Sequence, residues 1–318
     1  MKKILITGAS GFIGSFLVEK ALEKGWEVWA GIRKTSSREY LKDSHIRFID
    51  LDYSNKGILK QQIESHVAEH GKWDYIIHNA GVTKCTSVSD FYKVNYRYTV
   101  HFIEALEDTE TVPEKFILMS SLSAMFPETA YGASKLEAEQ HLEYCSSIPY
   151  VIMRPTGVYG PREKDYYMML KAVRSGFDVT AGFKPQRLTF VYVADLVQAV
   201  FLALESNVSK RIYTVSDGNI YTDSEYAGLV KKVLDKQSVV RIKVPLFILY
   251  IVSVVSEFFG KMLRKPSTLN RDKYKIMKQR DWSCSDQPLV DDLGYKPEYD
   301  LEKGLKASVE WYKQNEWL

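Results

Sequence analysis

The chain has few of the features that mark exported, membrane-spanning or nucleic-acid-binding proteins. Its 318 residues hold only three cysteines, Cys85, Cys145 and Cys284, which are too widely spaced for a zinc motif or a disulfide framework. The apolar run at the N-terminus is too short for an export signal, so we expect a cytoplasmic protein. A net charge of +3 is too small to predict binding to nucleic acid.

Long apolar segments are also scarce. The most apolar one, VPLFILYIVSVV at 244–255, is far shorter than the roughly 20 residues that a membrane-crossing helix needs. We expect it to form a buried core helix. Two alternatives are a lid over an apolar substrate and a patch that rests on a membrane surface.

Apolar runs alternate with helical patterns through the first half of the chain. Such alternation predicts a doubly wound α/β fold, in which a parallel sheet is covered by helices on both faces. The expected strands are 2–10, 27–33, 46–52, 75–81, 115–121 and 150–160, and the expected helices are 11–25, 58–71, 89–107 and 134–145.

The alternation weakens after residue 160. A strand and helix at 188–205, a strand at 238–245 and a closing amphipathic helix at 300–317 are still recognisable. We therefore expect a dinucleotide-binding domain over 1–160 and a smaller α/β substrate-binding lobe over 161–318. No linker-like segment separates them, so we expect the lobe to pack on the first domain, with chain crossings.

A glycine-rich stretch, TGASGFIG, follows the first strand and opens the first helix. Gly8 suits a tight turn, Gly11 allows close approach of a pyrophosphate, and Gly14 allows the helix to pack on the strand. The first helical residues, Phe12 and Ile13, would offer free N–H groups to the phosphates. The sequence thus predicts a dinucleotide site here.

The residue that chooses between NAD and NADP should lie about twenty positions further on, at the end of the second strand. This chain has Arg33 there, followed by Lys34, Ser36 and Arg38. A carboxylate would repel the 2′-phosphate of NADP, whereas an arginine can bind it through two hydrogen bonds. We therefore expect NADP(H) to be preferred over NAD(H); the alternative is a solvated basic loop.

Two further strand ends should lie beside the cofactor. Asp50 and Leu51 end the third strand, where they could touch the adenine, and Asn79, Ala80 and Gly81 end the fourth.

Tyr131 and Lys135 in YGASK lie one helical turn apart, at the start of the helix that follows the fifth strand. A serine cluster lies about ten residues upstream. The same tyrosine–lysine spacing without that context occurs at Tyr167/Lys171, Tyr274/Lys278 and Tyr299/Lys303, which we interpret as polar helix faces.

The order of the motifs TGASGFIG, NAG, VNYRYT, MSSLSA, YGASK and RPTGVYGP resembles the extended branch of the short-chain dehydrogenase/reductase superfamily, the NAD(P)-dependent epimerase/dehydratase type. The resemblance is strong over residues 1–200 and implies a Rossmann-type fold. The apolar second lobe resembles the hydroxysteroid dehydrogenase and dihydroflavonol reductase subgroups more than the sugar-nucleotide enzymes.

The resemblance implies roles for individual residues. Tyr131 would be the general acid/base, and Lys135 would lower its pKa and hold the nicotinamide ribose. Ser121 would bind the substrate oxygen, with Ser123 as the main alternative and Ser120 the third serine in the cluster. Asn95 would support the active-site helix and its water.

The resemblance also extends beyond this centre. Pro155, Thr156 and Val158 would line the nicotinamide end, and Arg187 is a candidate for a substrate diphosphate. A homodimer through helices near 90–107 and 132–145 is implied as well. The stretch HVAEH at 66–70 matches a zinc-protease pattern, but it lies on an expected outer helix without a third ligand, so we predict no metal site.

Three functions remain open. The first is an NADP(H)-dependent oxidoreductase that interconverts an alcohol and a carbonyl on a largely apolar or mixed small molecule. The second is a nucleoside-diphosphate-sugar epimerase or dehydratase that uses tightly bound NAD(P). The third is a non-catalytic NADP-binding sensor or scaffold, which the complete Tyr/Lys/Ser set disfavours.

Overall fold

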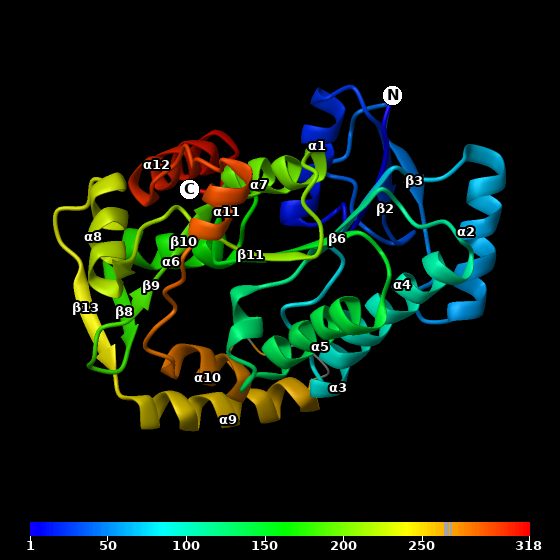
Figure 1. Ribbon diagram of the computed structural model, residues 1–318. Coiled ribbons are helices and arrows are strands. Elements are labelled where there is room, and N and C mark those ends of the chain that lie inside the picture. The colour runs from blue at the N-terminus through cyan, green and yellow to red at the C-terminus, as the bar shows by residue number, and fades with distance from the viewer. Residues whose placement is uncertain (264–266, 268) are drawn as a thin grey trace. The chain divides into compact units, whose positions relative to one another are not determined.

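The computed structural model describes residues 1–263, 267 and 269–318 (Figure 1). The chain divides into two compact units. Unit 1 comprises Met1–Arg154 and Val197–Tyr213, and unit 2 comprises Pro155–Leu196 and Thr214–Leu318. The boundary predicted at 160/161 falls a few residues after this division, and the chain crosses back into unit 1 for one helix and part of a strand.

Unit 1 is built on a seven-stranded sheet whose order is β11-β6-β5-β4-β1-β2-β3. From β3 to β6 each pair of neighbouring strands is parallel, which is the doubly wound order expected from the alternating pattern. The strands are β1 (Lys3–Thr7), β2 (Glu27–Gly31), β3 (Arg47–Ile49), β4 (Tyr75–His78), β5 (Lys115–Met119), β6 (Tyr150–Pro155) and β11 (Arg211–Val215).

The helices of unit 1 bury apolar residues against this sheet, around a core that includes Trp73, Phe102 and Phe116. Continuous apolar strands form here because both faces of a parallel sheet are covered. The helical segments are α1 (Phe12–Glu23), α2 (Lys56–His70), α3 (Val88–Phe91), η1 (Tyr92–Arg97), α4 (Tyr98–Asp108), η2 (Leu122–Met125), α5 (Ala130–Cys145) and α7 (Val193–Glu205), which begins in unit 2.

One predicted helix is interrupted. The single helix expected at 89–107 is instead α3, a π-helical turn η1, and α4. A π-helical turn inside an α-helix is frequent at functional sites, because it redirects one side chain without ending the helix. The strand expected at 150–160 likewise divides into β6 and a separate strand of unit 2.

Unit 2 has short strands in three two-stranded pairings: β7 with β10, β8 with β13, and β9 with β12. Its core is rich in tyrosine and includes Tyr159, Tyr226 and Tyr312. The elements are β7 (Gly157–Tyr159), α6 (Asp165–Arg174), β8 (Phe177–Ala181), β9 (Arg187–Leu188), β10 (Phe190–Tyr192), β12 (Tyr221–Thr222), α8 (Asp223–Val233), β13 (Val240–Val244), α9 (Leu246–Met262), α10 (Arg271–Lys278), α11 (Gln287–Leu293) and α12 (Leu301–Gln314).

The apolar stretch at 244–255 is helical, as expected, but the expectation of burial is wrong. It forms most of α9, and side chains along this helix such as Phe247 and Ile251 are exposed. Within the described part of the chain, no helix combines the length and apolarity that crossing a bilayer requires.

Candidate active site

The glycine-rich turn joins β1 to α1 in unit 1. Gly8 has a positive φ of 64°, and its carbonyl accepts a hydrogen bond of 3.1 Å from the N–H of Gly11. A Cβ on Gly14 would overlap the carbonyl oxygen of Gly8, so only glycine allows the helix to pack this closely. Gly11 is the N-cap of α1 without a side-chain cap, so the N–H groups that open the helix at Phe12 and Ile13 are available to an anion.

The residues that follow β4 contact this turn. The side-chain amide of Asn79 donates to the carbonyl of Gly8 at 3.4 Å, and a Cβ on Gly8 would lie 2.9 Å from the N of Ala80. A Cβ on Gly81 would lie 3.1 Å from Nζ of Lys135. The predicted phosphate turn, the end of β4 and the predicted catalytic lysine are therefore brought together at the carboxyl edge of one sheet.

A buried chain of hydrogen bonds runs through this edge. The N–H of Ala80 donates to Oγ1 of Thr7 (3.0 Å), which contacts Nδ1 of His78 (3.0 Å), while Nε2 of His78 contacts Oγ1 of Thr99 (3.1 Å). Thr99 donates to the carbonyl of Asn95 at 2.9 Å, so His78 must donate through Nε2 and accept through Nδ1. Burial lowers the pKa of His78 to about 3, which keeps the ring neutral.

Asn95 lies in the π-helical turn and is 1% exposed. Its Oδ1 accepts from the N–H of Val82 at 2.8 Å, and its Nδ2 donates to the carbonyl of Val82 at 3.0 Å and to Oγ of Ser134 at 3.1 Å. The hydroxyl of Ser134 donates in turn to the carbonyl of Tyr131 at 2.9 Å. Asn95 thus links the loop after β4 to the first turn of α5.

Tyr131 lies in the first turn of α5 and is half-buried. Its hydroxyl is hydrogen-bonded to that of Ser121; burial raises the pKa of Tyr131, and the bond to Ser121 partly offsets this. The turn is fixed locally, because Oγ1 of the N-cap Thr129 accepts from the N–H of Gly132 at 2.9 Å. A Cβ on Gly132 would overlap the carbonyl of Ser123, so this glycine sets the approach of α5 to the serine-bearing turn.

Lys135 lies one turn further along α5 and is 6% exposed. Its Nζ donates to the carbonyl of Met119 at 2.9 Å. Burial lowers the pKa of Lys135 to about 8, and the charge of Glu139 opposes the shift. Glu139, one more turn along, is 1% exposed and accepts hydrogen bonds from Ser120 and from Nε of Arg154 at 3.0 Å. Ser120 is therefore engaged away from the tyrosine.

The basic loop after β2 is exposed. The carboxylate of Asp50, at the end of β3, accepts from the backbone N–H of Lys34 at 3.0 Å. The guanidinium of Arg38 stacks on Phe48, with 4.0 Å between its carbon and the ring centroid. The side chain of Arg33 itself is exposed to solvent. The contacts of Lys34 and Arg38 thus fix the loop on both sides of Ser36, and the side chain of Arg33 remains accessible to a ligand.

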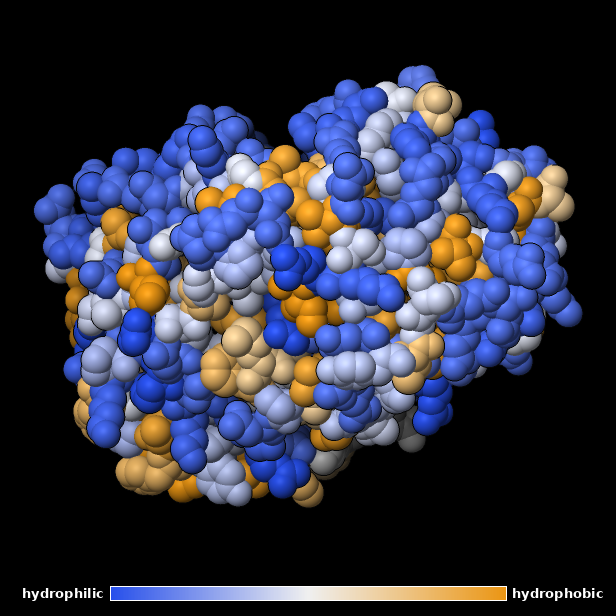
Figure 2. Space-filling model, in the orientation of Figure 1, coloured by the Kyte–Doolittle hydropathy of each residue, from blue (hydrophilic) through white to orange (hydrophobic). Residues whose placement is uncertain are grey.

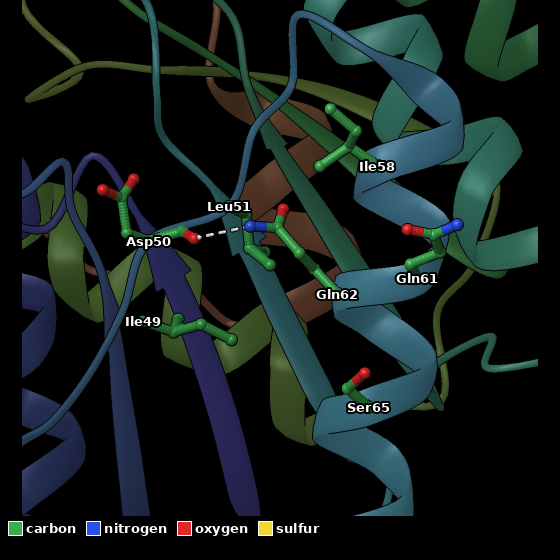
Figure 3. A pocket seen from close by; sticks show the side chains of 7 residues that line it. All are labelled: Ile49, Asp50, Leu51, Ile58, Gln61, Gln62 and Ser65. Atoms are coloured by element: carbon green, nitrogen blue, oxygen red, sulfur yellow. Dashed lines mark hydrogen bonds between the residues drawn. The ribbon is translucent and has the colours of Figure 1, made fainter.

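An open depression lies between the end of β3 and helix α2, as Figure 3 shows. Leu51 is buried beneath it, and Nε2 of Gln62 donates to the carbonyl of Asp50 at 3.2 Å. In this view the carboxylate of Asp50 points away from Gln62. The lining residues are Ile49, Asp50, Leu51, Ile58, Gln61, Gln62 and Ser65, around a volume of about 310 Å³.

The remaining candidates belong to unit 2, which begins at Pro155, the last residue of β6. The N–H of Thr156 donates to the carbonyl of Val215 at 3.1 Å, whereas its Oγ1 is buried without a hydrogen-bond partner among the described residues. Val158 lies on β7, which pairs with β10.

Arg187 is exposed on β9 and pairs with Asp281 at 3.2 Å. It therefore has an acidic partner within unit 2 in place of the diphosphate that the resemblance implied, and its proposed role stays untested.

Several neighbours of the candidate site residues were missed from the sequence. Thr7, His78 and Thr99 carry no motif, and no spacing rule joins three residues from different elements. Glu139 could have been found, because it continues the spacing of four residues from Tyr131 and Lys135 along one helix face.

Comparisons with known proteins place these features in a family. The model of the NAD dependent epimerase/dehydratase family matches residues 4–216. Ceramide reductase from Caulobacter vibrioides is 22% identical over 99% of this chain and 96% of its own length. UDP-glucose 4-epimerase from Vibrio cholerae is 25% identical over 98% of this chain and 96% of its own length.

Solved structures show the same fold. The UDP-glucose 4-epimerase of Thermotoga maritima, solved with UDP-glucose, has a TM-score of 0.77 at 21% identity and covers 98% of this chain and 99% of its own. The dTDP-glucose 4,6-dehydratase of Bacillus anthracis, solved with NAD, has a TM-score of 0.75 at 18% identity and covers 100% of this chain and 98% of its own. With the family model matching most of the chain, the protein belongs to the NAD dependent epimerase/dehydratase family and is an NAD(P)-dependent enzyme of the short-chain dehydrogenase/reductase type.

Proposed function

We propose that the protein interconverts an alcohol and a carbonyl on a small molecule, with Tyr131 moving the proton. The observation that carries this proposal is the hydrogen bond between Ser121 and Tyr131, with Lys135 one turn further along the same buried face of α5. A substrate oxygen that replaces this bond would meet two hydroxyls, one that donates the proton and one that holds the oxygen in place.

The surroundings of Tyr131 suit this exchange. Burial alone raises the pKa of its phenol, which favours the form that can donate a proton to a carbonyl oxygen. Lys135, with its pKa lowered to about 8, is close to the range in which it can change charge. In the reverse direction, a charged Lys135 would stabilise the phenolate that accepts the proton. Asn95 acts through Ser134 and is a positioning residue.

The residues of unit 1 fit a dinucleotide. Glycine at positions 8 and 14 allows a tight backbone turn that a Cβ would block, and the N-terminus of α1 is uncapped by any side chain. Bound NAD(P) would supply or accept the hydride. Arg33 supports a preference for NADP(H), because its exposed guanidinium follows β2 where a carboxylate would select NAD. Asp50 and Leu51 stay predicted contacts of the adenine.

Two reaction types, here called settings, are compatible with this chemistry. They differ in whether the hydride stays on the product or returns to the cofactor. The comparisons favour a nucleotide-sugar epimerase or dehydratase, because proteins with these names occur among both the sequence relatives and the solved structures. A net NADP(H)-dependent reduction of an apolar or mixed substrate is favoured by Arg33 and by a relative named ceramide reductase. Arg187, already paired with Asp281, gives the sugar-nucleotide setting no added support.

One experiment separates the two settings. The protein is incubated with NADPH and a panel of apolar ketones, and separately with nucleoside-diphosphate sugars, while nucleotide absorbance and sugar products are followed. Oxidation of NADPH by a ketone would support net reduction, and epimerised or dehydrated sugar without net cofactor change would support the sugar-nucleotide setting. The matched control is Tyr274→Phe, at a tyrosine with the same lysine spacing but outside the proposed site; Tyr131→Phe should lose either activity and Tyr274→Phe should keep it.

The homodimer implied by the resemblance stays a prediction. It would pair α4 and α5 of two copies in a four-helix bundle. Light scattering coupled to gel filtration would measure the mass, and a monomer would contradict the prediction.

A further inference from the structure

Helix α9 exposes its apolar side to solvent, whereas an ordinary surface helix buries it. The side that faces the rest of the protein carries Leu249 (8% exposed) and Ser253 (0%), followed by the half-buried Glu257 and Gly260. These positions recur every three to four residues and so define one face. Small and polar residues therefore occupy much of the side where a globular protein normally places its apolar stripe.

The opposite side is apolar and exposed. Phe247, Ile251, Phe258 and Met262 are 56–65% exposed and recur at helical spacing. Figure 2 shows exposed hydrophobic side chains in the region that α9 occupies in Figure 1. Contiguous apolar surface of this extent marks an interaction site. The other exposed hydrophobic residues of this segment are Ile248, Tyr250, Val252, Val254, Val255, Phe259 and Leu263.

A basic segment lies alongside this apolar helix. Helix α10 runs next to α9 (Figure 1), and Arg271 pairs with Glu257 of α9 at 2.9 Å. Residues 271–280 hold five basic side chains against one acidic one, and Lys273, Lys275 and Lys278 are exposed. The surface therefore combines an apolar helix with adjacent positive charge.

We propose that α9 and α10 form a docking surface for an anionic phospholipid bilayer. Helix α9 has 17 residues, so it would lie in the plane of the interface with its exposed side among the acyl chains. The lysines of α10 would contact the phosphates of the headgroups. The rings of Tyr250 and Tyr274, 5.3 Å apart, would lie at the boundary, where amphipathic aromatic residues are favoured.

Charge favours a bilayer over a second copy of the chain. A two-fold contact through α9 would bring two basic α10 segments together, and like charges facing each other in a partly dry interface are costly. An anionic bilayer instead complements these charges. This inference does not depend on the proposed function, because docking is measured without turnover.

The test is sedimentation of the full-length protein with vesicles of phosphatidylcholine alone and of phosphatidylcholine with phosphatidylglycerol. We expect binding to the anionic vesicles that weakens as salt is added. Phe247→Glu/Phe258→Glu should lower the partition coefficient by roughly 100-fold or more, since each buried phenyl ring contributes on the order of tenfold. The control Val88→Glu/Ile220→Glu, at residues outside α9 and α10 that are 58% and 47% exposed, should bind like the wild type.

The charge contribution has its own matched pair. Lys273→Gln/Lys278→Gln should weaken binding to anionic vesicles by roughly tenfold or more. Lys42→Gln/Lys313→Gln, which removes the same charge from exposed lysines elsewhere, should change it little. Melting curves of all four double variants show whether each remains folded.

Three results would overturn the proposal. Wild-type protein that stays in the supernatant with every vesicle would do so. The proposal would also be wrong if the wild type formed a stable dimer that Phe247→Glu/Phe258→Glu converts to a monomer, and neither protein bound vesicles. Equal binding by the α9 variant and its control would assign the membrane contact to another surface.

Discussion

Gly132 offers a sharp test of how the candidate active site is assembled. A Cβ at this position would overlap the carbonyl oxygen of Ser123 and lie 3.0 Å from both the carbonyl of Phe126 and Oγ1 of Thr129. The first and second are backbone atoms, so they cannot move aside by rotating a side chain. Gly132→Ala must therefore push the first turn of α5 away from η2.

The expected magnitude combines two opposing effects. Overpacking of this kind costs about 1–3 kcal/mol. Alanine in place of glycine inside a helix contributes about 0.5–1 kcal/mol of stabilisation where space allows. The net change for Gly132→Ala is therefore a loss of about 0–2.5 kcal/mol in the free energy of unfolding.

The same shift should harm catalysis more than stability. It moves Tyr131 relative to Ser121, and a displacement near 1 Å in a reacting geometry lowers kcat by about 100-fold. The assay is denaturant unfolding followed by circular dichroism, together with kcat on whichever substrate the screen identifies.

Gly228 supplies the matched control. It lies inside α8, where a Cβ would meet no atom of a neighbouring element within 4 Å, so Gly228→Ala should stabilise by about 0.5–1 kcal/mol and leave kcat unchanged. If Gly132→Ala proved as stable and as active as Gly228→Ala, the close approach of α5 to the serine turn would not be what fixes the site.

Four further outcomes are expected. Tyr131→Phe should lower kcat by about 100-fold to 10,000-fold while nucleotide binding, measured by fluorescence titration, stays nearly intact; substantial residual turnover would exclude Tyr131 as the acid/base. Arg33→Ala should weaken binding of NADP by about 1–3 kcal/mol and that of NAD much less, and equal losses would exclude a 2′-phosphate contact. Without added nucleotide, Lys135 has a folded-state pKa of about 8 against 10.5 for the free side chain, so the unfolded chain binds more protons between those pH values and the free energy of unfolding rises with pH. Relative to Lys135→Met, the wild type should gain up to about 3 kcal/mol of stability across this pH range. Parallel pH profiles of the two proteins would contradict the lowered pKa of Lys135. Glu139→Gln leaves Arg154, whose side chain is 17% exposed, without its charge partner and should destabilise by about 3–5 kcal/mol, whereas Arg187→Gln, in an exposed pair, should cost less than about 1 kcal/mol in the same denaturant titration.

Much of unit 1 could be predicted from local chemistry. The apolar runs at β1, β4 and β5 are continuous because both faces of a parallel sheet are covered, so the sequence alone indicates the doubly wound order. The spacing of Gly8, Gly11 and Gly14 is equally local, since a turn between one strand and one helix decides it.

The exposure of α9 could not be predicted. The periodicity of 244–255 specifies an apolar helix, but whether that helix is covered depends on which elements pack against it. Its neighbour α10 is polar and basic, and the side of α9 turned inward carries Ser253, so the apolar side remains exposed. A pattern along the chain contains no information about such partners.

By itself the sequence determined the fold class and predicted the cofactor turn and the Tyr131/Lys135 pair, because each rests on residues close together in the chain. Only the tertiary structure decided which serine contacts Tyr131, and that His78 joins the glycine-rich turn to Asn95. Those contacts join separate elements, where a side chain's partner depends on how strands and helices pack in three dimensions. The same packing left α9 with its apolar side exposed.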